Sequence, residues 1–117
     1  MSDKITLAEL LTATGGQLLK SGVEEFSSVS TDGRKNNAGK LFFALKGEKF
    51  DAHQFLRQAI DSRAAGIVVH ESPSAHGINL ETVSASIIKV DDTLKALQAL
   101  AAHWRQKMNA KIVAISG

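Results

Sequence analysis

Hydrophobic residues are grouped along the chain in short blocks that predict a series of strands. The block Leu41–Leu45 is a run of five apolar residues between two polar loops, which is typical of a strand buried on both faces. The blocks Ile67–Val69 and Ile87–Val90 are rich in β-branched residues and predict two further strands. Shorter strands are expected at residues 17–20 and 26–30.

Apolar residues spaced three or four positions apart predict helices between these strands. The first helix starts at Thr6, which forms a capping box with Glu9, and stops at Gly15. The second helix starts at Asp51, its expected N-cap, and precedes the strand at residues 67–69. A strand, a helix and a strand in this order predict a βαβ unit with a right-handed crossover. We therefore expect an α/β fold, a small mixed-sheet domain with flanking helices.

The longest predicted helix starts at Asp91 or Asp92 and reaches about Met108. Its apolar residues repeat at intervals of three and four and predict one stripe, made of Leu94, Leu97, Ala101, Trp104 and Met108. About two heptads are too few for a coiled-coil seam, so the stripe is expected to pack on the core of the domain. The alternative is that the stripe is the surface of a non-catalytic protein-interaction module.

Composition limits the function without defining it. The 117 residues fit one domain, and 44% hydrophobic with 22% charged residues is ordinary for a globular protein. The net charge is only +2 with mixed signs, which argues against a nucleic-acid-binding surface. The chain has no Cys, no secretory signal pattern and no apolar run of 18 residues, so we expect a cytoplasmic protein with no membrane segment.

Conventional catalytic and metal motifs do not occur in the sequence. It contains no G-x-S-x-G, no H-E-x-x-H and no complete G-x-x-x-x-G-K-S/T. No two of the four histidines are spaced for a shared helical metal site, so no metal site is expected. His53, in the first turn of its predicted helix, is interpreted either as a ligand contact or as a structural residue. His70 and His76 are expected in loops, and His103 is expected on a helix surface.

Two polar segments flank the buried strand and carry the most specific pattern of the chain. The first reads S-T-D-G-R from Ser30 to Arg34, and the second reads L-K-G-E-K-F-D-A-H-Q-F from Leu45 to Phe55. Together with the G-K-L-F-F-A that precedes Leu45, they closely resemble the N-terminal domain of the Mur ligase family. The resemblance is closest to the member that adds D-alanyl-D-alanine. The neighbouring ligase that adds the third peptide residue typically has a different string after the glycine at position 47, and it is kept as the alternative.

The resemblance implies a substrate-binding domain of an ATP-dependent ligase of peptidoglycan synthesis. In the intact enzyme, ATP and Mg²⁺ would activate the terminal carboxylate of UDP-N-acetylmuramoyl-tripeptide as an acyl phosphate, which the amine of D-alanyl-D-alanine would then attack. The groups that perform this chemistry are expected beyond Gly117. The chain alone is therefore expected to bind the UDP end of the substrate, without ligase or ATPase activity.

The same resemblance supplies the candidate substrate-binding residues. Uracil needs an adjacent donor and acceptor and an apolar surface, and the diphosphate needs cations or backbone N–H groups. The candidates are Thr31, Asp32, Gly33, Arg34, Lys46, Gly47, Glu48, Lys49, Phe50 and His53. Each has a structural alternative: Thr31 and Asp32 can cap a turn, Arg34 can form an ion pair, and Phe50 can pack on Phe55. Lys46 and Lys49 can be ordinary solvated charges.

Two features of these segments depart from the family pattern. Position 33 is commonly Ser or Thr in relatives, and Gly33 keeps only a backbone N–H for a substrate contact. Asp51 as N-cap places a carboxylate at the N-terminus of the second helix. We therefore expect the diphosphate to lie near Lys or Arg and not at that helix terminus.

The C-terminal block Lys111–Ile115 is predicted to be a strand that runs into Ser116 and Gly117. By resemblance it is the first strand of the central ATP-binding domain, and Gly117 matches the first glycine of the phosphate loop. The expected division is therefore 1–110 for the substrate domain and 111–117 for a truncated second domain. We expect a monomer, with pairing through the C-terminal strand as the alternative.

Overall fold

The computed structural model describes residues 4–31, 38–45, 56–71 and 77–116, with the backbone alone for residues 108–116. Its centre is a five-stranded sheet. The strand order is β2 (Gln17–Lys20), β7 (Ser86–Lys89), β6 (Gly66–Val69), β5 (Leu41–Phe43) and β4 (Val29–Ser30). Strands β4 to β7 are parallel, and β2 pairs with β7 in the antiparallel direction. The predicted mixed sheet is thus confirmed.

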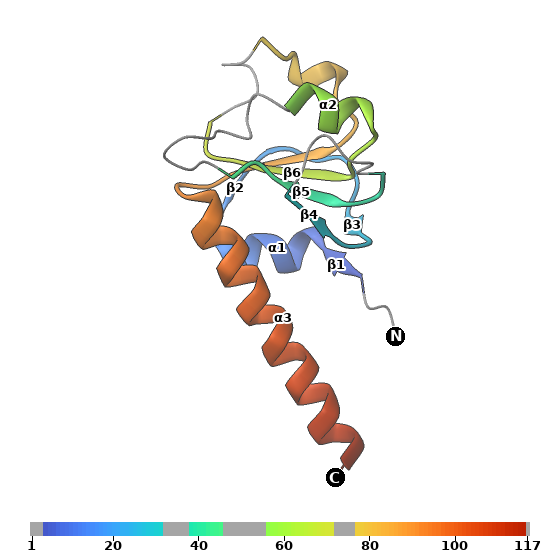
Figure 1. Ribbon diagram of the computed structural model, residues 1–117, viewed down its shortest axis with the longest axis vertical. Helices are drawn as coiled ribbons and strands as arrows, with labels where there is room; N and C mark the ends of the chain where they lie inside the picture. The colour runs from blue at the N-terminus through green and yellow to red at the C-terminus, as the bar shows by residue number, and fades with distance from the viewer. Residues whose placement is uncertain (1–3, 32–37, 46–55, 72–76, 117) are drawn as a thin grey trace.

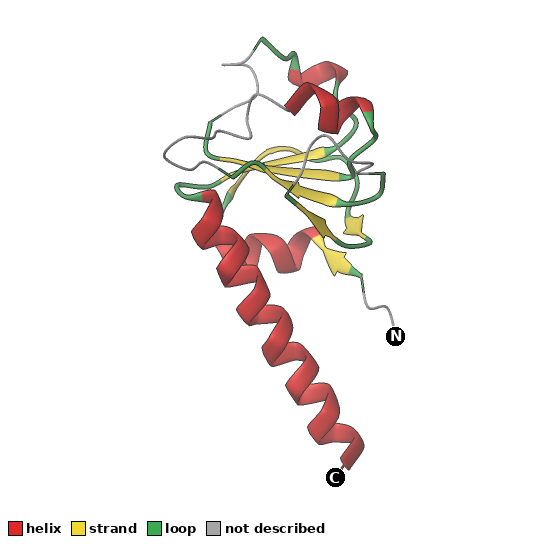
Figure 2. Ribbon diagram, viewed as in Figure 1, coloured by secondary structure: helices red, strands yellow, loops and turns green. Residues whose placement is uncertain are grey.

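Helices cover both faces of this sheet, which gives three layers (Figures 1 and 2). Helix α2 (Leu56–Asp61) lies on one face, and helices α1 (Leu7–Thr14) and α3 (Thr93–Ser116) lie on the other. A short antiparallel pair, β1 (Ile5–Thr6) with β3 (Glu25–Phe26), borders the second face. A 3₁₀ turn at Leu80–Thr82 precedes β7. None of the described helices is both long and apolar enough to cross a membrane.

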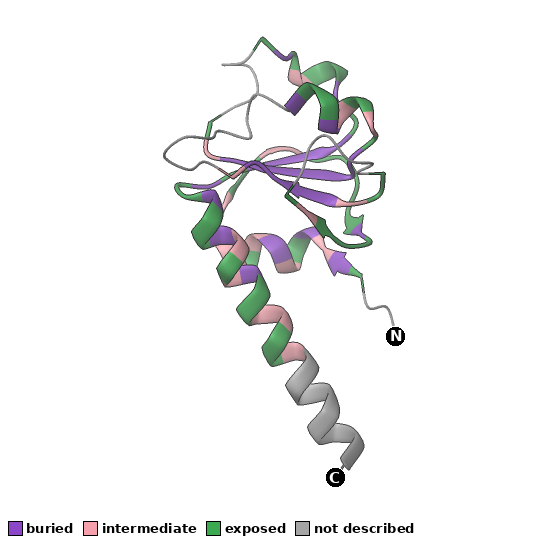
Figure 3. Ribbon diagram, viewed as in Figure 1, coloured by how far each residue is buried: buried purple, intermediate pink, exposed green. Residues whose placement is uncertain are grey.

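Strands β5 and β6 are buried from both sides (Figure 3), as the apolar run at 41–45 predicts for β5, whereas β4 at the edge of the sheet is partly exposed. Leu41, Phe42 and Phe43 are all fully buried. Side chains alternate across a strand, so Phe42 joins a core cluster with Leu56 of α2, whereas Leu41 and Phe43 join a second cluster with residues of α1 and α3. One short strand therefore contributes to both cores.

Helix α1 begins and ends as its sequence predicts. The backbone N–H of Glu9 donates to Oγ1 of Thr6 at 3.1 Å, which is the capping contact expected of an N-cap threonine. At the other end, Gly15 adopts φ +66° and its N–H donates to the carbonyl of Leu11 at 2.9 Å. This left-handed conformation favours glycine and terminates the helix.

Helix α3 starts where expected, but it buries a different stripe. Its cap is Asp92, whose Oδ1 accepts from the N–H groups of Leu94 and Lys95 at 2.9 and 3.1 Å. The buried apolar residues among those described are Ala96 and Leu100, with Leu97 and Trp104 partly buried against the same core cluster. Of the predicted stripe, Leu94 is 49% exposed and Ala101 is exposed, and the side chain of Met108 lies outside the described residues. Alanine and leucine occur on several faces of this helix, so the apolar pattern alone does not fix which face packs.

The strand predicted at Lys111–Ile115 is wrong in this structure, because α3 continues as a helix to Ser116. A strand requires a neighbour for its backbone hydrogen bonds, whereas a helix satisfies them within the segment. The β-branched residues 112, 113 and 115 therefore remain helical where they have no paired strand. With no strand there, the alternative of pairing through it has no basis in this structure. The expected monomer and the domain division at residue 110 stay predictions.

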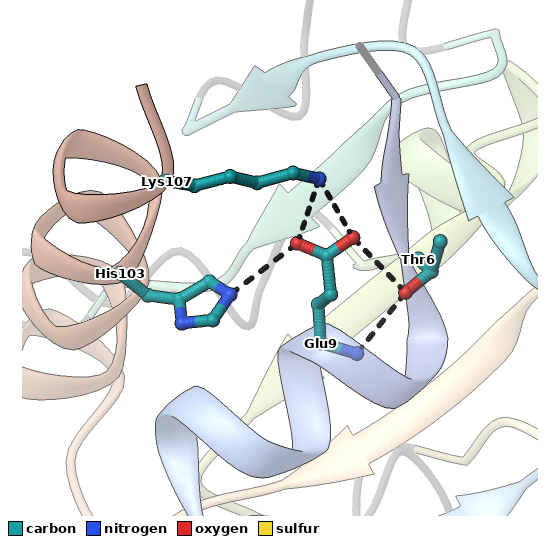
Figure 4. A network of polar contacts seen from close by, with 4 residues as sticks. All are labelled: Thr6, Glu9, His103 and Lys107. Carbon is teal, nitrogen blue, oxygen red and sulfur yellow. Dashed lines mark hydrogen bonds and ion pairs between the residues drawn. The ribbon is translucent and has the colours of Figure 1, made fainter. Parts of the chain in front are cut away.

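A polar network joins α1 to α3 (Figure 4). Lys107 Nζ donates to both carboxylate oxygens of Glu9 at 3.1 and 3.2 Å, and His103 Nε2 lies 3.3 Å from Glu9 Oε2. The hydroxyl of Thr6 also donates to Glu9 Oε1 at 3.3 Å. Burial by itself raises the pKa of Glu9. The hydrogen bonds and charge of Lys107, together with the hydrogen bonds of His103 and Thr6, lower that pKa overall. The side chain of His103, predicted on the helix surface, is thus turned toward α1.

The network makes a testable contribution to stability. A lowered carboxyl pKa in the folded state stabilises the fold above the unfolded pKa, and that stabilisation is lost as the pH falls through the folded pKa. Glu9→Gln is expected to lower the free energy of unfolding at pH 7 by at most about 1 kcal/mol, since Lys107 is partly exposed. The difference should shrink as the pH falls through the lowered pKa of folded Glu9, so a second measurement at the lowest pH at which the protein stays folded should show a smaller loss than at pH 7. Urea denaturation at the two pH values measures this, with exposed Glu24→Gln as the control. An equal loss at both pH values would contradict it.

Candidate functional site

The four parallel strands end together at one edge of the sheet, which we call the carboxyl edge. The pairs Ser30↔Phe42, Phe43↔Val68 and Val69↔Lys89 fix the register across them. The described residues that directly follow the strands are Thr31, Ala44, Leu45, His70, Glu71, Val90, Asp91 and Asp92. In open α/β sheets, ligands bind outside the carboxyl ends of the strands, so this edge is the candidate binding site.

The structure brings the starts of both predicted binding segments to this edge. Thr31 is exposed and directly follows β4, and Leu45 follows β5, the neighbouring parallel strand. They are the last described residues before Asp32 and Lys46. The sequence alone left open whether the two segments meet, and the parallel pairing of β4 with β5 is what puts their starting points on one edge.

The other predicted binding residues lie outside the described residues. These are Asp32, Gly33, Arg34, Lys46, Gly47, Glu48, Lys49, Phe50 and His53, together with Gly117. Their contacts with substrate, and the alternatives of turn capping, ion pairing and packing, therefore stay predictions. The expected N-cap Asp51 and the loop residue His76 also lie outside the described residues.

The carboxyl edge also carries a histidine that the sequence pattern did not single out. His70 directly follows β6, and its side chain is only 16% exposed. Its Nε2 lies 3.8 Å from Oε1 of Glu71, whose side chain is half exposed. The strand ends at Val69, so the prediction that His70 lies in a loop is confirmed.

Two hollows lie beside the α1–α3 face. One, of about 460 Å³, adjoins the end of β7 and is lined by residues that include Gly15, Lys89, Asp91 and Lys95. The other, of about 370 Å³, is mainly apolar and lies between Val29 and the Leu97–Trp104 stretch of α3. Thr31 lines neither hollow. The hollow beside β7 is lined by both lysines and carboxylates, so its charge does not favour an anion.

Comparison with known proteins agrees with this fold. Residues 25–105 match the family model described as "Mur ligase family, catalytic domain". That match covers more than half of the chain, and the protein belongs to the Mur ligase family.

Three relatives define the resemblance more closely. The UDP-N-acetylmuramoyl-tripeptide–D-alanyl-D-alanine ligase of Haemophilus influenzae is 39% identical over 97% of this chain, which corresponds to 22% of that protein. The ligase of the same name from Synechocystis is 35% identical over the whole chain, or 26% of that protein. A crystal structure of MurF from Acinetobacter baumannii has a TM-score of 0.75 at 31% identity, over 92% of this chain and 22% of that one. The chain thus spans about a quarter of the length of these relatives.

Membership in the family implies dependence of the intact enzyme on ATP and Mg²⁺. Neither the sequence motifs nor the described residues of this chain form a site for ATP or Mg²⁺. The sequence contains no complete phosphate-loop motif, and the described ranges hold no group of three His, Asp or Glu residues placed to bind a metal ion. We therefore assign this chain no step in which ATP or Mg²⁺ takes part.

Proposed function

We propose that this chain is the substrate-binding part of a ligase that joins D-alanyl-D-alanine to UDP-N-acetylmuramoyl-tripeptide. The observation that carries the proposal is the parallel pairing of β4 with β5, which puts Thr31 and Leu45 at the same edge of the sheet. Two motifs that are 11 residues apart in the sequence therefore start from neighbouring strand ends. The names of the relatives supply the substrate class.

In this proposal, the two segments divide the recognition of the UDP group. Residues 31–34 offer backbone and hydroxyl groups to uracil, and the arginine at 34 offers a charge to the diphosphate. Residues 46–50 contribute two lysines for the diphosphate and one aromatic ring for the base, with His53 nearby in sequence. The exposed position of Thr31 leaves its hydroxyl accessible for such a contact.

The direct test is a ¹⁵N–¹H NMR titration with UDP-N-acetylmuramoyl-tripeptide, and with UDP and ATP as comparison ligands. We expect saturable shifts at Thr31, Leu45 and His70, and in the segments that follow Thr31 and Leu45. UDP should reproduce most of these shifts, and ATP should not. Absence of saturable shifts at millimolar ligand, or shifts confined to the hollow beside Lys89 and Lys95, would overturn the proposal.

A matched pair of arginine variants sharpens the titration. Arg34→Ala is expected to weaken UDP binding by about tenfold, which corresponds to about 1.4 kcal/mol for one charge-assisted contact. Arg57→Ala, on the exposed side of α2, removes the same charge elsewhere and should leave the affinity unchanged. Equal effects of the two variants would indicate general attraction of an anion and no specific site.

Tighter binding of the corresponding dipeptide nucleotide would instead favour the neighbouring ligase that adds the third peptide residue.

A further inference from the structure

The hollow beside β7 lies at the carboxyl edge, on the α1–α3 face of the sheet. Its walls include Gln17 at the start of β2, Val90 and Asp91 after β7, and Lys95 of α3. Only β6 lies between β7 and β5, and neighbouring strands are about 4.8 Å apart, so the ends of β5 and β7 are about 10 Å from each other. The volume of about 460 Å³ is that of an ordinary small-molecule site. A ligand anchored at the ends of β4 and β5 therefore has this hollow within reach along the same edge.

Three polar side chains of this hollow are not engaged by other groups of the described protein. Asp92 is engaged, because its Oδ1 caps α3. Within the described ranges, by contrast, no ion pair and no side-chain hydrogen bond involves Gln17, Asp91 or Lys95. A carboxylate accepts hydrogen bonds, an ammonium group donates them, and a primary amide does both. The hollow thus offers donors and acceptors together, without a predominant charge.

We propose that this hollow is the subsite for the amino sugar of the UDP-linked substrate. The sugar is bonded directly to the diphosphate, so it is the first group of the substrate beyond the predicted UDP contacts. Its ring is uncharged, and its hydroxyl and acetamido groups both donate and accept hydrogen bonds, which matches the mixed groups of the hollow. A phosphate would instead meet Asp91 and Asp92 beside the lysines. The inference rests on the proposed function and names the part of the substrate that follows the diphosphate at this edge.

An NMR titration with three ligands tests which part of the substrate enters the hollow. UDP lacks the sugar, UDP-N-acetylglucosamine adds the sugar alone, and UDP-N-acetylmuramoyl-tripeptide adds the sugar and the peptide. We expect saturable shifts at Gln17, Asp91 and Lys95 with both sugar nucleotides and not with UDP. Shifts at these residues with UDP alone, or only with the tripeptide nucleotide, would overturn the inference, because the hollow would then hold the nucleotide or the peptide. Binding of UDP without binding of UDP-N-acetylglucosamine would overturn it as well.

Variants of Asp91 measure the contribution of one sugar contact by isothermal titration calorimetry. Asp91→Ala is expected to weaken binding of UDP-N-acetylglucosamine about tenfold and to leave the affinity for UDP unchanged. Asp91→Asn keeps an acceptor oxygen and should recover part of the loss. Asp61→Ala, at an exposed carboxylate of α2 on the opposite face, is the matched control and should change neither affinity.

The ratio of the two affinities separates this inference from the proposed function. An unchanged ratio in Asp91→Ala would overturn the sugar subsite, whether both affinities fall equally or neither falls. Failure of the wild type to bind any of the three ligands would instead overturn the proposed function. Asp91 is exposed, so its variants are expected to fold, and urea denaturation run in parallel checks this.

Discussion

Phe42→Ala is expected to lower the free energy of unfolding by about 3–5 kcal/mol, the usual cost of removing a fully buried phenylalanine. Phe42 is the middle residue of β5 and has no exposed surface. It pairs with Ser30 on one side and Ile67 on the other, and its ring belongs to the cluster beneath α2. Strands on both sides restrict how far the backbone can close the cavity, so the loss should lie in the upper part of this range.

Urea denaturation followed by circular dichroism and Trp104 fluorescence measures this loss. Phe42→Leu keeps most of the volume and should cost about 1–1.5 kcal/mol. Val29→Ala is the surface control, because Val29 lies in the same sheet but is 36% exposed, and it should cost less than about 1 kcal/mol. A cost for Phe42→Ala no larger than that for Val29→Ala would show that β5 does not lie at the centre of the fold. Since whole domains are stable by only about 5–15 kcal/mol, Phe42→Ala is also expected to reduce nucleotide binding through partial unfolding.

Local sequence features predicted the parts of the fold whose cause is local. The N-cap contact of Thr6 with Glu9 and the aspartate before α3 act within a few residues, and both are confirmed. The apolar run at 41–45 correctly predicts a buried strand, although β5 ends at Phe43. Features that depend on distant partners were predicted less well. Helix α3 buries Ala96 and Leu100 because α1 and the sheet pack against that side of the helix. The β propensity of residues 111–115 does not produce a strand, because no other strand pairs with this segment.

The candidate site shows the same division between local and distant information. The resemblance identified the two binding segments, but no local pattern indicated that the strands before them are parallel neighbours. His70 follows β6 outside any strand, as predicted for a loop residue. Its neighbours on the adjacent strands are defined only after β5, β6 and β7 are aligned. Sheet register depends on contacts between distant residues, so it cannot be obtained from a single sequence with certainty.

Gly66→Ala is expected to lower the free energy of unfolding by about 1–2 kcal/mol, although alanine generally stabilises an ordinary backbone position. Gly66 opens β6 without a positive φ, so loss of unfolded-state freedom alone would contribute about 0.4–1 kcal/mol in favour of alanine. However, a Cβ at this position would lie 2.5 Å from Cε1 of Phe26 and 2.8 Å from Cδ1 of Leu41. Both neighbours are fully buried, and overpacking of this kind costs about 1–3 kcal/mol.

A double-mutant cycle with Phe26→Leu tests whether that contact is the cause. The smaller side chain removes the nearest clash, so Gly66→Ala should cost at least about 1 kcal/mol less in the Phe26→Leu background than in the wild type. Gly77→Ala is the matched control. A Cβ at Gly77 would meet nothing within 4 Å, but φ is +78°, so backbone strain of about 1–2 kcal/mol should appear equally in both backgrounds. Additive costs for Gly66→Ala and Phe26→Leu would show that Phe26 does not pack over β6. The contact between the small β1–β3 pair and the central sheet would then need to be reassigned, because Phe26 is the residue through which β3 reaches the buried end of β6.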